Sequence, residues 1–349
     1  MENSNRQSQY PIKLKVKNMN DLESLNLDIA IATYGHTNAL KKGDVPIKGI
    51  RPNFIEVKPI IAAFRRMVRD VEFDVCEMAP ATYMIAREAG APFKALPIFI
   101  FRRFHHAGLV YRDDAGINTP KDLENKKVGV RAYSVTTGIW TRGIMMNDYG
   151  VDNSKITWVV DDEEHVKSLV LPKNVIHAKE DQSLVNMMAS GELSAAFTDN
   201  AGIGRAGAPT DGWQAGGRIK PPEYKELFPN ALDLETQWFN KTGIYPVHGL
   251  IVVKDELLKK HPWMAQSLFN AFNESKEIYL KQLHNGESVS DKDDHYRSMS
   301  KIVGKDPLPY GIDANRPSIQ ALIDYCYQQE LLKSKYSIDD MFVNVNSQN

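Results

Sequence analysis

Apolar runs and segments of helical periodicity alternate along most of the chain. In the first third, four apolar runs predict buried strands: residues 27–32, 53–57, 73–78 and 94–101. Between them, apolar side chains recur at the spacing of one helix face over residues 59–68, and again toward residue 90. The repeated order of strand, turn and helix predicts an α/β fold.

The same order continues through the rest of the chain, with clear helix boundaries. Thr119 precedes Pro120, which predicts a helix start, and Gly191 directly follows another helical pattern. Strands are predicted at residues 127–130, 156–160, 175–177, 194–197 and 242–253. Helices are predicted from residue 134 to 146 and at residues 182–189, 255–283 and 319–332. Residues 1–25 are interpreted as an extension with a short edge strand at residues 12–16.

Residues 97–112 differ from the other strands, because the apolar run ends in two arginines and two histidines. If the run stays extended, side chains alternate, so Arg102 and His106 share one face. Arg103 and His105 would then share the other face. We expect Arg102 and His106 to face a cleft as an anion clamp beside a proton-transfer group. The alternative is a solvated face with hydrogen-bonded histidines.

Other polar side chains stand at predicted strand ends, where open α/β sheets place ligand groups. They are Tyr34, His36, Thr37, Glu77, Asp199 and His248. Near residue 134, hydroxyls and free amides at a helix start suit a carboxylate or a phosphate, or else simply cap the helix. The candidates there are Tyr133, Ser134, Thr136 and Thr137. The remaining histidines, His165, His177, His261, His284 and His295, are expected at the surface.

Composition narrows the class of protein. The 349 residues, 42% hydrophobic and 25% charged, suffice for two domains with a substantial core. A formal net charge of -1 excludes an overall electrostatic attraction to nucleic acid or an anionic membrane. No segment reaches the roughly 18 uninterrupted apolar residues of a membrane span. The polar N-terminus and the widely separated Cys76 and Cys326 predict a cytoplasmic protein with reduced thiols.

Residues 202–222 are rich in glycine and proline and include a Gly-x-Gly-x-x-Gly pattern at residues 202–207. A dinucleotide site requires a helix directly after this pattern, but Pro209 and Gly212 break one. We therefore exclude nucleotide binding and expect a flap or a subunit contact. A homo-oligomer is compatible with this expectation.

Several sequence blocks together resemble the 4,5-dihydroxyphthalate decarboxylase family across residues 28–316. The blocks lie at residues 73–78, 102–106, 128–130, 140–143, 191–193, 242–246 and 309–316. The resemblance implies a type 2 periplasmic-binding-protein-like fold with a ligand cleft between two lobes. One lobe would comprise residues 26–108 and 246–349, and the other residues 109–245.

Carried over position by position, the family pattern places its first arginine on Arg102 and its histidine on His106. The chain departs from the pattern where His105 replaces an arginine and where residues 35–36 are Gly-His in a turn that is otherwise Tyr-Asp-Arg-Thr. His248 stands one position earlier than the histidine expected after the Thr-Gly-Ile-aromatic-Pro block. These departures bear on which acid is bound.

The resemblance implies cofactor-independent decarboxylation of a hydroxylated aromatic carboxylate, first of all 4,5-dihydroxyphthalate to 3,4-dihydroxybenzoate and carbon dioxide. A hydroxyl para to the departing carboxylate makes the ring itself the electron sink. Arg102 would clamp a carboxylate, and His106, or else His36, would protonate the ring. Phenolic hydrogens would be accepted by Glu77, Asp199 or His248. The expected substrate contacts are completed by Tyr34, Thr37, His105, Tyr133, Ser134, Thr136 and Thr137.

No metal is assigned, because the candidate histidines and carboxylates have no diagnostic ligand spacing. Two alternatives stay open. One is a solute-binding or sensory protein that closes around a small acid and releases it unchanged. The other is an enzyme of the same fold that acts on a different acid.

Overall fold

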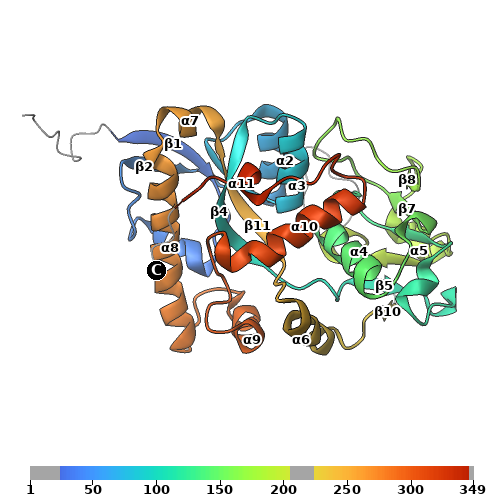
Figure 1. Cartoon of the computed structure of the whole chain (residues 1–349). Coiled ribbons are helices and arrows are strands. Elements are labelled where there is room, and N and C mark those ends of the chain that lie inside the picture. The colour runs from blue at the N-terminus through green and yellow to red at the C-terminus, as the bar shows by residue number, and fades with distance from the viewer. Residues whose placement is uncertain (1–23, 205–223, 346–349) are drawn as a thin grey trace, which may run out of the picture.

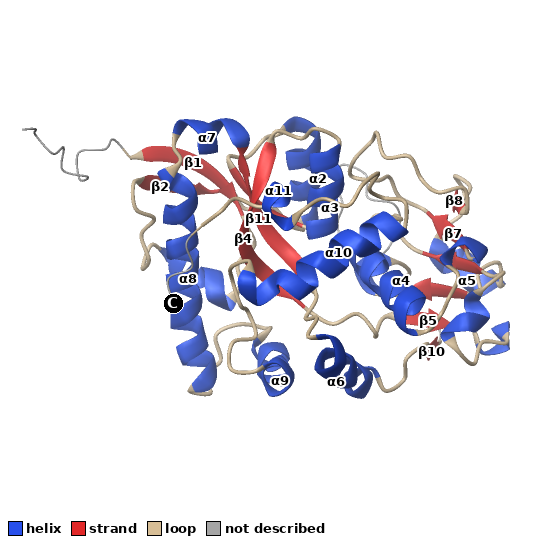
Figure 2. Cartoon of the chain, viewed as in Figure 1, coloured by secondary structure: helices blue, strands red, loops and turns tan. Residues whose placement is uncertain are grey.

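A computed structural model describes residues 24–204 and 224–345, which fold around two β-sheets (Figures 1 and 2). The first sheet has the order β2-β1-β3-β11-β4, in which β1 pairs in parallel with β2 and β3, while β11 runs antiparallel to β3 and β4. Its strands are β1 (Leu25–Ala30), β2 (Ile50–Phe54), β3 (Val75–Met78), β4 (Phe93–Arg102) and β11 (Val247–Lys254).

The second sheet has the order β10-β5-β9-β6-β7-β8. Pairing is parallel from β9 through β8 and antiparallel from β10 to β9. Its strands are β5 (Leu109–Tyr111), β6 (Lys127–Gly129), β7 (Thr157–Val160), β8 (Val175–His177), β9 (Ala195–Phe197) and β10 (Lys225–Glu226). The two sheets with their helices form the two lobes of a periplasmic-binding-protein-like fold, as expected.

Helices cover both faces of the first sheet, so its strands are apolar on both sides. Ile98 and Ile100 of β4 pack with α8, whereas the alternate residues Ala95 and Phe99 pack in the core shared with α2 and α3. The described helices are α1 (Asn38–Lys42), α2 (Ile61–Asp70), α3 (Pro80–Glu88), α4 (Thr136–Asp148), α5 (Leu184–Ser190), α6 (Ala231–Thr242), α7 (Asp255–Lys260), α8 (Trp263–His284), α9 (Asp293–Val303), α10 (Arg316–Gln328) and α11 (Ile338–Met341).

The chain passes between the sheets through residues 103–108 and again through residues 227–246, which contain α6. On this basis we propose lobe boundaries near residues 108 and 246. Helix α10 does not stay within the first lobe, because it packs against α4 and lies across the middle of the molecule in Figure 1. The rings of Trp140 and Tyr325 meet edge to face at this contact, 5.6 Å apart.

Three predicted elements differ from the structure. The helix predicted over residues 255–283 is two helices, α7 and α8, because Pro262 between them has no amide hydrogen to continue the first. Thr119 begins only a 3₁₀ turn (Pro120–Leu123), although its capping box is present. The strand expected at residues 53–57 is β2, which begins at Ile50 in parallel register with β1.

Two further expectations lie outside the described residues, namely the edge strand at residues 12–16 and most of the flap at residues 202–222. Across the described residues, none of the helices is both long and apolar enough to span a lipid bilayer.

Helices α4 and α10 are in contact, and Gly143 of α4 faces the ring of Tyr325 of α10. A Cβ at Gly143 would overlap the ring of Tyr325. Gly143→Ala should therefore lower the free energy of unfolding by about 1–3 kcal/mol, although alanine is the better helix former. Chemical denaturation measures the change. In a Tyr325→Leu background the same substitution should cost less, and an equal cost would contradict the ring contact.

Candidate active site

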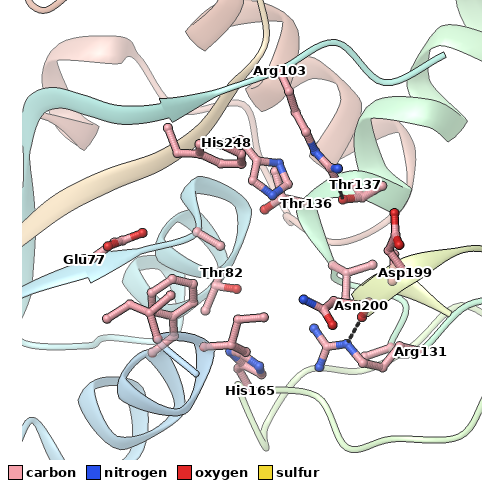
Figure 3. A pocket seen from close by; sticks show the side chains of 18 of the residues that line it. Glu77, Thr82, Arg103, Arg131, Thr136, Thr137, His165, Asp199, Asn200 and His248 are labelled. Atoms are coloured by element: carbon pink, nitrogen blue, oxygen red, sulfur yellow. Dashed lines mark hydrogen bonds between the residues drawn. The ribbon is translucent and has the colours of Figure 1, made fainter. Parts of the chain in front are cut away.

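A cavity of about 410 Å³ lies between the two sheets and is lined from both (Figure 3). The first sheet and its helices contribute apolar side chains and a few polar ones: Tyr34, Ile60, Ile61, Phe64, Glu77, Thr82, Phe101 and His248. The second contributes mainly polar groups: Arg131, Ser134, Thr136, Thr137, His165, Asp199 and Asn200. Arg103 and Lys292 also line the cavity. The wall from the first sheet is therefore largely apolar, and the wall from the second sheet is largely polar.

Glu77 is a buried carboxyl on the first wall, on strand β3, with 2% of its surface exposed. Its Oε1 accepts a hydrogen bond from the Tyr34 hydroxyl at 2.7 Å, and its Oε2 accepts one from the Ala32 amide at 3.0 Å. Burial raises the pKa of Glu77 to about 7, although both hydrogen bonds oppose the shift. Glu77 can therefore exchange a proton near neutral pH.

Arg103 is the first residue after β4, and its guanidinium reaches the opposite wall. It donates to the Thr137 hydroxyl at 2.7 Å and forms no ion pair with any residue that the structure describes. Burial lowers the pKa of Arg103, but a guanidinium stays protonated at neutral pH. The Thr136 hydroxyl beside it is buried and has no hydrogen-bond partner within residues 24–204 and 224–345. The Arg103 guanidinium, the Thr136 hydroxyl and the N-terminus of α4 together make this corner of the cavity favourable for negative charge.

Arg131 follows β6 and provides a second guanidinium on the same side of the cavity. Its Nη1 contacts Asp162 at 2.9 Å, and its Nε donates to the carbonyl of Asn200 at 2.8 Å. In Figure 3 Arg131 and Arg103 lie across the cavity from Glu77. Asp199 lines this side as well and acts on the charge of Arg103. The cavity thus has a side with two guanidinium groups and one carboxylate, facing a carboxyl of raised pKa.

Two histidines also line the cavity, His248 from β11 and His165 from the loop after β7. Burial lowers the pKa of each well below its ordinary value, and nearby arginines lower it further: Arg103 for His248, and Arg131 foremost for His165. Both imidazoles are therefore neutral at neutral pH in the empty cavity. His165 was expected at the surface, but 6% of it is exposed, so that expectation is wrong.

The expectation that Arg102 and His106 face the cleft is wrong, because neither lines the cavity. Strand β4 ends at Arg102, so the alternation of faces does not continue through the next residues. Arg102 is buried instead, where it donates to the carbonyl of Tyr245 and the side-chain oxygen of Asn315. Its guanidinium also lies 4.3 Å from the centre of the Tyr245 ring.

The ring of His106 packs against Phe228 and Trp238, with centroid distances of 5.5 Å and 5.7 Å. Burial lowers the pKa of His106 to about 4. His36 is also outside the cavity, among the rings of Tyr34, Tyr279 and Tyr296, and burial lowers its pKa to about 3. Neither position suits a residue that protonates a ligand in the cavity.

The other predicted contacts divide into two groups. Tyr34, Glu77, Ser134, Thr136, Thr137, Asp199 and His248 come together around the cavity. Thr37 instead fixes its own turn, since its hydroxyl accepts from the Tyr34 amide at 2.8 Å. Tyr133 is in the core, where its hydroxyl accepts from Asn153. His105 is behind His248, and the Ser134 hydroxyl is already committed to Glu164.

Sequence reasoning missed Arg131 as a site residue and assigned Arg103 to the wrong face. Arg131 directly follows the predicted strand at residues 127–130. Asp199 was identified because ligand groups lie at strand ends, and the same argument applies to Arg131. His165 was predicted to be exposed because it follows four acidic residues in the sequence. Two of these neighbours, Asp162 and Glu164, are bonded to Arg131 and Ser134 inside the protein.

Within the described ranges, no three His, Cys, Asp or Glu side chains gather in a way that could hold a metal ion. Both cysteines, Cys76 and Cys326, are buried and free.

Some known proteins resemble this chain in fold, and others resemble it in sequence. Residues 51–221 match the family described as "ABC transporter, phosphonate, periplasmic substrate-binding protein". The crystal structure of the periplasmic aliphatic sulphonate binding protein SsuA from Escherichia coli has the same fold, with a TM-score of 0.50 and 12% sequence identity. That similarity covers 92% of this chain and 97% of the other.

Two relatives are named 4,5-dihydroxyphthalate decarboxylase. The protein from Comamonas testosteroni is 30% identical over 306 residues, which cover 84% of this chain and 89% of the relative. The protein from Pseudomonas putida is 35% identical over 188 residues, which cover 52% of this chain and 72% of the relative. The identity and coverage show that this chain belongs to the 4,5-dihydroxyphthalate decarboxylase family.

Proposed function

We propose that the protein removes carbon dioxide from a hydroxylated aromatic dicarboxylate, with 4,5-dihydroxyphthalate as the substrate and 3,4-dihydroxybenzoate as the product. The family supports this assignment. The observation that carries it is the polarity of the cavity, where Arg103 and Arg131 lie opposite Glu77. A dihydroxyphthalate has the matching polarity, because its two carboxylates lie on one edge of the ring and its two hydroxyls on the other.

The cationic side would hold the carboxylates. Arg103, with the hydroxyls of Thr136 and Thr137, suits one carboxylate, since a guanidinium fork binds carboxylate oxygens in pairs. Arg131 beside Asn200 suits the other. The ring would lie among the apolar side chains of the first wall, which are Ile60, Ile61, Phe64 and Phe101. Such a clamp fixes the reacting carbon relative to the acid and base groups.

The chemistry then needs a base at the hydroxyl end and an acid at the carboxylate end. Glu77 would accept the proton of the hydroxyl para to the departing carboxylate, which raises electron density on the carbon bearing that carboxylate. A proton adds to that carbon, the carbon–carboxylate bond breaks, and its electron pair restores the aromatic ring as carbon dioxide leaves. The proton donor in this proposal is His248, because it lines the cavity near Arg103. Expected roles for His106 and His36 are dropped.

The proposal includes a cytoplasmic location. The two buried cysteines are free thiols, as is usual for proteins of a reducing compartment.

Purified protein should convert 4,5-dihydroxyphthalate to equal amounts of 3,4-dihydroxybenzoate and carbon dioxide without added cofactor. Chromatography of the aromatic acids and trapping of the gas measure both products. Phthalate, which has no hydroxyl, should bind but not react, because its ring is no electron sink. Tight binding of the dihydroxy acid with complete recovery of it would instead support a solute-binding protein.

Loss of the carboxylate clamp should weaken substrate binding. Arg103→Ala should raise KM by about 100-fold, because one charge-assisted contact to the substrate is lost. Arg103→Lys should recover only part of this, since an ammonium cannot bind both oxygens as a fork. Arg316→Ala is a matched control at an exposed arginine, and its KM should equal that of the parent. An unchanged KM in Arg103→Ala would remove Arg103 from the clamp.

The base role of Glu77 predicts a pH dependence. Glu77 acts only when ionised, and its pKa is about 7, so kcat, which reports the complex in which His248 already holds its proton, should rise with pH through about 7. Glu77→Gln should lower kcat about 10²- to 10⁴-fold and abolish this rise. Glu180→Gln, at an exposed carboxyl, should keep the parental profile. The same rise through pH 7 in Glu77→Gln would assign it to another group.

A further inference from the structure

We propose that His105 and His248 act as a proton-holding pair, in which His248 contacts the bound aromatic dicarboxylate and His105 positions and stabilises its imidazolium form. This inference rests on the proposed function, because it concerns the same cavity and the same class of ligand. It adds a positioning residue that does not itself reach the ligand.

The two imidazoles are neighbours although His105 lies in the first connection between the sheets and His248 lies on β11. Their ring centroids are 5.1 Å apart, with 31° between the ring planes. His248 lines the cavity, whereas His105 is 1% exposed and lies behind it. The Nδ1 atom of His248 and the Nε2 atom of His105 are buried, and neither has a hydrogen-bond partner in the part of the chain that the structure describes.

Two unpartnered nitrogens on neighbouring rings are unusual in a packed interior, where each costs about 1–3 kcal/mol. They become favourable if one ring carries a proton that the other can accept as a hydrogen bond. A neutral His105 has one nitrogen free to accept, which is the group that an imidazolium at His248 would need.

Aromatic rings hold the pair in place from both sides. The ring of Trp140 lies parallel to His105 at 6.3 Å, and the ring of Phe101 meets His248 edge to face at 5.3 Å. The indole of Trp140 donates to the carbonyl of Val247 at 2.9 Å, directly before His248. The surroundings of both imidazoles are therefore linked, and His105 is placed to fix the orientation of His248.

The charges around the pair explain why it is neutral when the cavity is empty. Burial and the positive charge of Arg103 both disfavour an imidazolium at either position, and His248 and His106 disfavour it further at His105. His106 is next to His105 in the chain. The other charged or titratable groups that line the cavity are Tyr34, Glu77, Arg131, His165, Asp199 and Lys292. Beyond the N–H proton that each neutral imidazole carries, the pair can thus gain at most one more.

A doubly negative ligand reverses this balance. Two carboxylates beside Arg103 would offset its charge and add a negative potential at His248. A proton then moves from bulk solvent to an imidazole nitrogen of the pair, and the solution loses one proton for each ligand bound. The imidazole pair therefore carries the proton before the reaction begins, close to the ring carbon that must be protonated.

Calorimetric titration with phthalate at about pH 7 tests this uptake directly, in two buffers of different ionisation enthalpy. The parent for the test is Glu77→Gln, because Glu77 would otherwise take up a proton of its own. We expect uptake approaching one proton per site. His248→Gln should reduce it to near zero, His105→Phe should at least halve it, and His105→Gln should recover part of it. His106→Gln is the matched control outside the cavity and should keep the parental value.

Binding of phthalate without proton uptake would overturn the pair and leave the proposed function standing. Failure of both phthalate and 3,4-dihydroxybenzoate to bind would overturn both proposals. Unchanged uptake in a folded His105→Phe protein, checked by its thermal transition, would overturn the role of His105. A merely structural role for His105 would lower stability without changing the number of protons taken up.

Discussion

The buried guanidinium of Arg102 is the interaction on which the geometry of the site depends. A buried cation is costly unless hydrogen bonds satisfy it, and Arg102 finds its acceptors at Tyr245 and Asn315. Arg102 begins the first connection between the sheets, and Tyr245 lies in the second. Asn315 in turn donates to the carbonyls of Pro309 and Gly311 at 2.9 Å and 2.7 Å. One side chain therefore joins both connections and the segment that follows α9.

This junction explains why three separate sequence blocks, at residues 102–106, 242–246 and 309–316, carry the family resemblance together. They meet at one place in the interior. Arg103 follows Arg102 directly, His105 comes three residues after Arg102, and His248 comes three residues after Tyr245. The residues to which we assign binding and proton transfer are thus placed by an arginine whose hydrogen bonds lie within the protein interior.

The second wall is held by a different network. Asp162 contacts Arg131 from one oxygen and Arg65 of helix α2 from the other, at 2.9 Å and 3.3 Å. Glu164 accepts hydrogen bonds from the backbone of Tyr133 and Ser134, ahead of α4. Asp162 and Glu164 therefore fix the orientation of Arg131 and of the segment before α4. Arg103, by contrast, has no ion-pair partner among the described residues, so the two arginines of the proposed clamp differ in how they are held.

The sequence by itself determined the α/β fold, most strands and the site positions at strand ends, because hydrophobic periodicity and strand-end chemistry are local. It identified Glu77, Thr136, Thr137 and His248 for that reason. It could not decide between Arg102 and Arg103. Alternation assigns faces only while a strand continues, and β4 ends at Arg102. The acceptors that bury Arg102 are 143 and 213 residues away, so only the tertiary structure shows which arginine is satisfied internally and which faces the cavity.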